Sequence, residues 1–192
     1  MKIYGFKFDR VIAKQQWSQL INHNFPTSKE IYWFDDEHCF FHSEININQT
    51  LNELLPLMEN DLSCQITALI THDCDNLSKK ALDLAAKYQK GKLLSIADVC
   101  LLAVLKNETD FMKIFEDYFN HLDAELLHTN EVFLANNFSG TVSAQLLYIH
   151  RNTLLYRRDK FQQLTKLNLR DFDDASLFKF WLTTISPLKL NT

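Results

Sequence analysis

The feature that most constrains the fold is a change in hydrophobic periodicity near residue 75. Before this point, short runs rich in β-formers alternate with helical segments, whereas the later apolar patterns all have helical spacing. Mixed elements followed by helices alone are typical of an α+β domain joined to an all-α region. We therefore predict an α+β chain whose two parts have different architectures.

The first part contains the order strand, helix, strand, strand, helix, strand. KIYGFKF predicts a strand, RVIAKQQWSQLINHNF a helix, and EIYWFDDEHCFFHSEI two strands joined as a hairpin. NQTLNELLPLMENDL predicts a second helix and CQITALITH a buried strand. This order predicts a ferredoxin-like domain over residues 1–75.

The helical periodicity of residues 76–120 predicts a helical connector. Its last helix, within ETDFMKIFEDYFNHL, carries an apolar stripe that must face either a core or a partner, and burial is the favoured interpretation. The stripe consists of Phe111, Ile114, Phe115, Tyr118, Phe119 and Leu122.

The composition argues against most enzyme classes. The chain has only three glycines, which excludes a glycine-rich phosphate loop, and it contains neither GxSxG nor HExxH. Its four cysteines lack CxxC spacing, so reduced and mostly buried thiols are expected. We predict no catalytic residue, no cofactor and no enzymatic activity.

Two histidine-containing strings are weaker candidates for a site. On a strand, His38 and His42 would lie about 13 Å apart, too far to share an ion, so no metal site is predicted. The string THDCD follows a predicted strand end, where ligands often bind. A turn and a helix cap explain it more simply.

The sequence predicts a cytoplasmic protein with no membrane partner. Its apolar runs, such as VCLLAVL, are too short to span a bilayer. Its first residues lack the basic region and apolar block of a signal peptide.

Positive charge is concentrated in one window of an acidic chain. The formal net charge is −4, but residues 151–170 contain six basic residues and one acidic residue, a balance of +5 that leaves −9 for the rest. A basic stripe on an acidic body suits a protein that offers one face to a polyanion. A solvated helix face is the alternative interpretation.

The segment FLANNFSGTVSAQLLYIHRNTLLYRRDKF has the pattern of a helix-turn-helix. One helix ends at Asn136-Asn137, Ser139-Gly140-Thr141 supply a turn and cap, and a short helix covers Val142 to Leu147. A second helix begins near Arg151. We expect this helix to pack through Leu154, Phe161 and Leu164, and to present donors for phosphates and base edges in its first turn.

The string IHRNTLLYRRDKFQQLTKLNLRDFDDA resembles the C-terminal helix-turn-helix of the PucR/CdaR family of sugar-diacid and purine-catabolism regulators. The match extends upstream through LLHTNEVFLANNFSGTVSAQLL, and the helix pair also looks like the Fis-type DNA-binding module. The resemblance implies an all-α DNA-binding domain over residues 121–192. It also implies a GGDEF-like domain before it, with FDDEHCFF at the signature turn but without the signature glycines and acids of a cyclase.

Three residues depart from the family pattern. Leu155 stands where a basic residue is common, and Lys166 replaces a usual glycine. Arg158 occupies a usual core position, so it must snorkel, pair with an acid or face DNA. The chain is also about half the usual length of family members, so we expect no large sensory region.

Two functions remain in competition. In the first, the chain is a transcriptional regulator that binds double-stranded DNA as a homodimer, and replacing Arg151 and Arg157 with alanine abolishes binding without changing the thermal midpoint. The predicted DNA-binding residues are Ser143, Gln145, His150, Arg151, Asn152, Thr153, Tyr156, Arg157 and Arg158. In the second, the helix-turn-helix is only a fold, and the chain modulates a full-length regulator by protein contact. Whether the N-terminal domain binds a small-molecule effector or only dimerises stays open.

Overall fold

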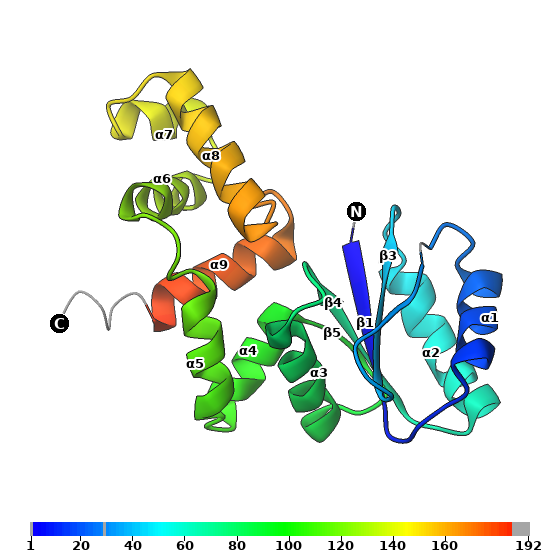
Figure 1. Ribbon diagram of the computed structural model, residues 1–192. Coiled ribbons are helices and arrows are strands. Elements are labelled where there is room, and N and C mark those ends of the chain that lie inside the picture. The colour runs from blue at the N-terminus through cyan, green and yellow to red at the C-terminus, as the bar shows by residue number, and fades with distance from the viewer. Residues whose placement is uncertain (1, 29, 186–192) are drawn as a thin grey trace. The chain divides into compact units, whose positions relative to one another are not determined.

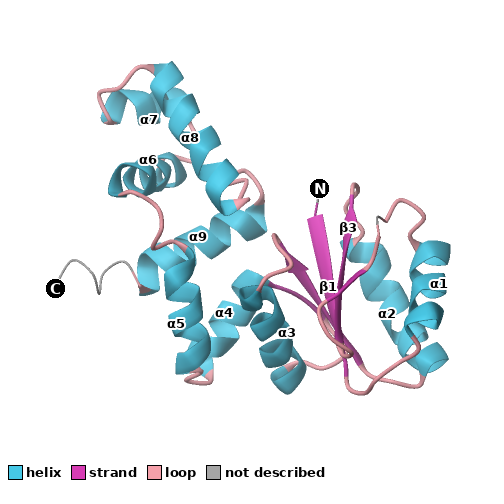
Figure 2. Cartoon of the chain, viewed as in Figure 1, coloured by secondary structure: helices cyan, strands magenta, loops and turns pink. Residues whose placement is uncertain are grey.

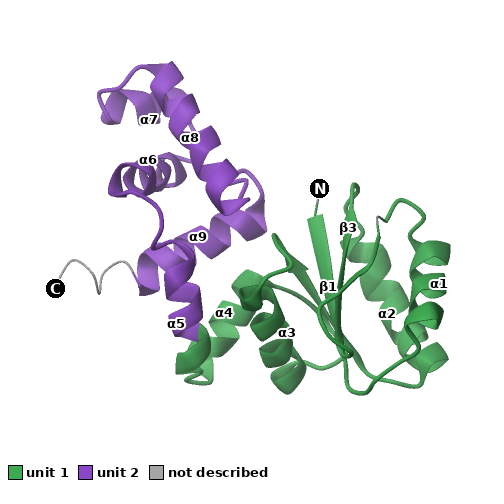
Figure 3. Cartoon of the chain, viewed as in Figure 1, with its two compact units in different colours: residues 1–111 green, residues 112–192 purple. Residues whose placement is uncertain are grey.

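The computed structural model describes residues 2–28 and 30–185 and divides into two compact units. Unit 1 covers residues 1–111 and unit 2 residues 112–192 (Figure 3). The boundary falls inside helix α5 (Thr109–Tyr118). The predicted division into domains at residues 75 and 120 stays a prediction, and its last seven residues lie outside the described part.

Unit 1 is built on a five-stranded sheet with the strand order β2-β3-β1-β4-β5. Strand β1 is antiparallel to β3 and β4, β2 is antiparallel to β3, and β4 is parallel to β5. The strands are β1 (Lys2–Phe8), β2 (Tyr32–Trp33), β3 (His38–Ser43), β4 (Ile66–Thr71) and β5 (Leu93–Ser95). The helices are α1 (Lys14–Asn24), α2 (Asn48–Leu62), α3 (Asn76–Tyr88) and α4 (Ile96–Leu105). The α+β class and the predicted order of the first six elements are confirmed. The prediction that residues 76–120 are purely helical is wrong at β5, whose short run pairs with β4 and so extends the sheet.

Helices cover both faces of this sheet (Figure 1). On the α1 and α2 face, the rings of Phe6 and Phe8 each lie 4.9 Å from Trp17 in edge contacts, which builds an aromatic core. On the α3 face, a Cβ atom at Gly5 would come within 2.6 Å of the Phe40 ring. Glycine is therefore required at this position for Phe40 to pack across β1.

Unit 2 is helical in its described part (Figure 2), and its side chains form a separate aromatic core. The ring of Phe119 lies 4.9 Å from Trp181 and 5.6 Å from Phe178, and the Phe178 ring lies 5.0 Å from Phe161. After α5, its helices are α6 (Ala124–Ala135), α7 (Gly140–Leu146), α8 (Arg151–Thr165) and α9 (Phe172–Thr184). The predicted burial of the apolar stripe in residues 111–122 is confirmed at Phe111, Phe115, Phe119 and Leu122.

The prediction that Leu164 packs into the core of unit 2 is wrong. Leu154 and Phe161 are buried, but Leu164 is 45% exposed. Thr165 takes the buried position instead, with its hydroxyl donating to the Phe161 carbonyl over 2.8 Å. A threonine can be buried here because this bond within the helix satisfies its hydroxyl group.

No helix in the part of the chain that the structure describes is both long and apolar enough to cross a membrane.

Candidate nucleic-acid interface

The first turn of α8 presents polar side chains to solvent. Arg151, Asn152, Thr153 and Tyr156 are all exposed, and Tyr156 is 65% accessible. Within residues 2–28 and 30–185, the Arg151 guanidinium and the Asn152 amide have no hydrogen-bond or ion-pair partner in the chain. These groups retain their full capacity to donate hydrogen bonds to a ligand.

His150 caps this turn. Its Nδ1 accepts the backbone N–H of Asn152 over 3.2 Å, and its backbone carbonyl accepts the N–H groups of Thr153 and Leu154. Because Nδ1 is the acceptor, the neutral ring carries its proton on Nε2. This hydrogen bond fixes the exposed imidazole at the N-terminus of α8.

Helix α7 packs against α8. Ser139 caps α7, and Leu154 of α8 packs 3.6 Å from the position of a Cβ atom at Gly140. Ala144 is buried, as expected where two helices cross closely. Ser143 is also buried, and its hydroxyl donates to the Ser139 carbonyl over 2.7 Å. The predicted contact of Ser143 with DNA stays a prediction, and the burial of this side chain does not favour it.

Arg157 and Arg158 attach α8 to α6. The Arg157 guanidinium pairs with Glu125 and donates to the Thr129 hydroxyl over 3.3 Å. The Arg158 guanidinium lies 3.9 Å from the centre of the Phe133 ring, and burial lowers its pKa. Arg158 thus occupies its unusual position by stacking on an aromatic side chain. Both arginines have structural partners that the sequence did not predict.

A shallow hollow opens at the turn between α7 and α8. Most of its lining side chains carry hydrogen-bond donors, and none is acidic. Its lining residues are Thr141, Ala144, Gln145, Tyr148, Ile149, His150 and Arg151. Thr141 and Tyr148 were not among the predicted contacts. The sequence feature that could have indicated these two residues is the run of hydrogen-bond donors in GTVSAQLLYIHR.

Tyr148 is the most exposed large side chain of this turn. It is 96% accessible, and its φ of 52° lies in the left-handed region. A bulky residue there is strained, and strain of this kind gathers at ligand-binding sites. Tyr148 and Arg151 both line the hollow.

Internal pairing reduces the positive charge that unit 2 offers to a ligand. Arg157 is paired with Glu125, and the Lys160 Nζ atom lies 3.7 Å from Asp123. In the described ranges, three exposed cations of the basic window carry no ion pair, namely Arg151, Lys166 and Arg170. The charge available to a polyanion is therefore smaller than the sequence alone indicated.

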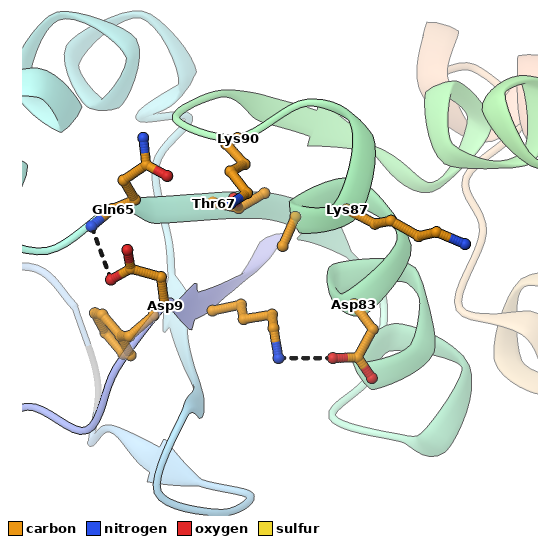
Figure 4. A pocket seen from close by; sticks show the side chains of 9 residues that line it. Asp9, Gln65, Thr67, Asp83, Lys87 and Lys90 are labelled. Atoms are coloured by element: carbon orange, nitrogen blue, oxygen red, sulfur yellow. Dashed lines mark hydrogen bonds and ion pairs between the residues drawn. The ribbon is translucent and has the colours of Figure 1, made fainter.

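Unit 1 contains a second candidate, a pocket of about 240 Å³ beside α3 (Figure 4). The Lys7 Nζ atom lies 2.8 Å from Asp83, and Lys87 pairs with Glu108 over 2.6 Å. Asp9 accepts the backbone N–H of Gln65. Lys7, Asp9, Asp83 and Lys87 thus already have partners, which leaves Lys90 as the lining charge without one among the described residues, so the pocket offers a ligand fewer free groups than the α8 turn does.

The other candidates in unit 1 have structural partners as well. His38 is buried, with Nδ1 2.8 Å from Asp35 and Nε2 3.0 Å from Asp83. In the string THDCD, the Asp75 carboxylate caps α3 by accepting the backbone N–H of Ser78. Among the described residues, no three histidine, cysteine or acidic side chains are placed to hold a metal ion.

Residues 126–183 match the PucR C-terminal helix-turn-helix domain, so the resemblance drawn from the sequence is confirmed. This range contains α7 and α8 and most of α6 and α9.

Three curated proteins show where the similarity lies. A "Leucine-rich protein" of Streptococcus dysgalactiae subsp. equisimilis is 28% identical over 75% of this chain and 56% of its own length. The proline-responsive transcriptional activator PutR of Bacillus subtilis is 44% identical over 25% of this chain and 12% of its own. The purine catabolism regulatory protein of Bacillus subtilis is 41% identical over 26% of this chain and 9% of its own. The chain thus spans about half the length of the first relative and much less of the other two.

Proposed function

We propose that this chain, which carries a PucR-type helix-turn-helix domain at residues 126–183, is a transcriptional regulator that binds duplex DNA through the first turn of α8. The observation that carries the proposal is the set of exposed and unpaired donors at Arg151, Asn152, Thr153 and Tyr156. A recognition helix contacts base edges with its N-terminal residues. The names of the two Bacillus regulators that are similar to part of this chain agree with this assignment.

The hollow between α7 and α8 supplies the backbone contacts in this proposal. Gln145, Tyr148 and His150 carry donors around it and no acid opposes them. Phosphate contacts of this kind set the position of a helix on the duplex but do not select sequence. The interface therefore consists of a phosphate side, at the hollow, and a base side, on the outer face of α8.

We further propose that the protein binds as a homodimer. Within the described part of each protomer, three exposed cations of the basic window carry no ion pair, namely Arg151, Lys166 and Arg170. Neutralising three phosphates gives a slope of about −2.7 in log K against log salt, which is small for a specific regulator. Two copies on neighbouring half-sites double this slope and the area of contact.

Unit 1 is proposed to be a GGDEF-like regulatory domain without cyclase chemistry. The sheet order β2-β3-β1-β4 and the β2–β3 hairpin support this comparison. The pocket beside α3 is the place where a small-molecule effector would bind, if unit 1 takes one.

A protein-interaction module is the alternative function. Val142, Leu146 and Leu155 are exposed apolar residues on α7 and α8, and Arg157 is held by Glu125. An apolar surface with few free cations also suits a protein partner such as a full-length regulator.

The test is fluorescence anisotropy on a pool of random duplexes and on the DNA upstream of the gene, from 50 to 200 mM salt, which are our chosen conditions. We expect affinity that falls steeply with salt and favours the upstream DNA. Arg151→Ala should weaken binding at least tenfold, whereas Lys179→Ala, the same charge change on an exposed residue of α9, should change it little. No binding at 50 mM salt would reject the proposal and turn the search to protein partners.

A further inference from the structure

Leu155 is an exposed apolar residue on the face of α8 that carries the proposed DNA contacts. Its side chain is 53% accessible. It lies four residues after Arg151 and three after Asn152, so these three side chains are neighbours on the helix surface. Tyr156, 65% accessible, follows it on the same outer face. About half of this leucine side chain is therefore open to a ligand, beside donors that have no partner among the described residues.

The position of Leu155 limits what it can contact on a duplex. A leucine side chain cannot donate to a phosphate or to a base edge. In the major groove, the apolar group that a base pair presents is the C5 methyl of thymine. Asn152, one turn earlier, has the side chain that bonds to the N6 and N7 atoms of adenine. Both residues therefore favour A·T pairs.

We propose that Leu155 contacts thymine methyl groups, so that this protein prefers DNA with A·T pairs beneath the first two turns of α8. The inference rests on the proposed function, because it requires α8 to lie in the major groove. Asp159 follows one turn after Leu155 and is exposed. Its carboxylate opposes close approach to phosphates, which confines the apolar contact to the start of the helix.

The thymine methyl can be tested without knowing the operator. The probes are 24-bp duplexes of alternating dA-dT and the same duplexes with deoxyuridine in place of thymidine, a length that we choose to span two half-sites. The two probes differ in the C5 methyl group alone and offer it in every register. Binding is measured by anisotropy at low salt for the wild-type protein, Leu155→Ala and Leu164→Ala. Leu164 is the matched control, since it is 45% exposed in the last turn of the same helix.

We expect the wild-type dimer to bind the thymidine duplex about fifteenfold more tightly than the deoxyuridine duplex, the effect of burying about one methyl group in each half-site. Leu155→Ala should bind both probes equally, and Leu164→Ala should retain the wild-type ratio. Both leucines are exposed, so neither substitution should change the thermal midpoint.

Two results would overturn the inference and leave the proposed function standing. The first is equal, salt-dependent binding of both probes by the wild-type protein. The second is a thymidine preference that persists in Leu155→Ala, because the methyl group would then act through DNA stiffness or another residue. Absence of binding to either probe and to random duplexes would reject DNA binding itself, and the inference with it.

Discussion

Two polar regions of this protein differ in whether their charged groups are paired within the chain. In unit 1, the charged groups around buried His38 pair with one another inside the chain. We call them the His38 cluster: Lys7, Asp35, Glu37, His38, Lys79 and Asp83. In unit 2, the side chains of Arg151 and Asn152 at the start of α8 face solvent and have no partner among the residues that the structure describes. Groups that are already paired stabilise a fold, whereas unpaired donors are available to a ligand, so the comparison separates structural charge from functional charge.

The carboxylates of the His38 cluster show how strongly this pairing acts. Burial raises the pKa of Asp35, but the hydrogen bonds from Lys79, His38 and the Glu37 backbone outweigh it and hold that pKa well below its ordinary value. Burial likewise raises the pKa of Asp83, and the bonds from His38 and Lys7 lower it to about 2. Both carboxylates are therefore ionised at neutral pH, because hydrogen bonds and positive charges from their partners stabilise the ionised form.

The largest expected effect comes from opening this cluster. Asp35→Ala removes the acceptor of His38, of Lys79 and of two backbone N–H groups. Since Asp35 is partly exposed, we expect a loss of about 2 kcal/mol in the free energy of unfolding rather than the larger cost of a fully buried pair. Hydrogen exchange of the β1 and β3 amides measures this in unit 1 alone.

Asp36→Ala is the control for Asp35→Ala. Asp36 is 72% exposed and pairs only at the surface with Lys14 over 3.0 Å, so its loss should cost less than about 0.5 kcal/mol. Equal effects of the two substitutions would contradict the structural role of the His38 cluster.

The cluster also predicts a pH dependence of stability. A carboxyl whose pKa is lower in the folded state than in the unfolded state stabilises the fold at higher pH. With Asp83 at a pKa of about 2 in the fold and about 3.9 unfolded, this stabilisation is complete above about pH 5 and is lost as pH falls toward 2. Urea unfolding gives the free energy of unfolding at each pH between 5 and 2.5, our chosen range. This free energy should depend less steeply on pH in Asp83→Asn than in the wild-type protein. An unchanged slope would show that other carboxyls carry the effect.

Local features of the fold were predictable from the sequence because they depend on neighbouring residues. The alternation of KIYGFKF and the order of the first six elements, for example, were read directly, and all appear in the structure. The helix-turn-helix was found through the turn at Ser139 and the helix start near Arg151, since caps are coded within three residues.

Long-range pairings were not predictable in the same way. The partners of Arg157 and Arg158 lie on α6, more than twenty residues earlier, and no spacing rule links them. The candidate site was therefore read as more basic than it is, because charge counting could not tell paired from unpaired arginines. Leu164 was misjudged for a related reason, since helical periodicity gives a face but not its exact limits.

Arg151 and Arg157 turn the comparison into a test within one helix. Arg157→Ala breaks the bonds to Glu125 and Thr129, and we expect it to lower the stability of unit 2 by about 1 kcal/mol. Arg151→Ala should leave stability within about 0.5 kcal/mol and weaken DNA binding about tenfold. Differential scanning calorimetry and anisotropy on both variants separate the two roles. A stability loss in Arg151→Ala would mean that the first turn of α8 is structural.

The smallest expected effect concerns Lys166, where charge and backbone strain can be separated. Lys166 ends α8 with φ 63°, a left-handed conformation that costs a residue with a Cβ atom about 1 kcal/mol. Lys166→Gly should therefore raise the thermal midpoint of unit 2 by about 4 °C. Lys166→Ala loses the same charge but keeps the Cβ atom, so its midpoint should stay near the wild-type value. If Lys166 contacts a phosphate, both variants should reduce the salt slope of DNA binding by about 1 per protomer. A slope that is unchanged in both would place Lys166 outside the interface and leave Arg151 and Arg170 as the unpaired cations of the basic window that face DNA.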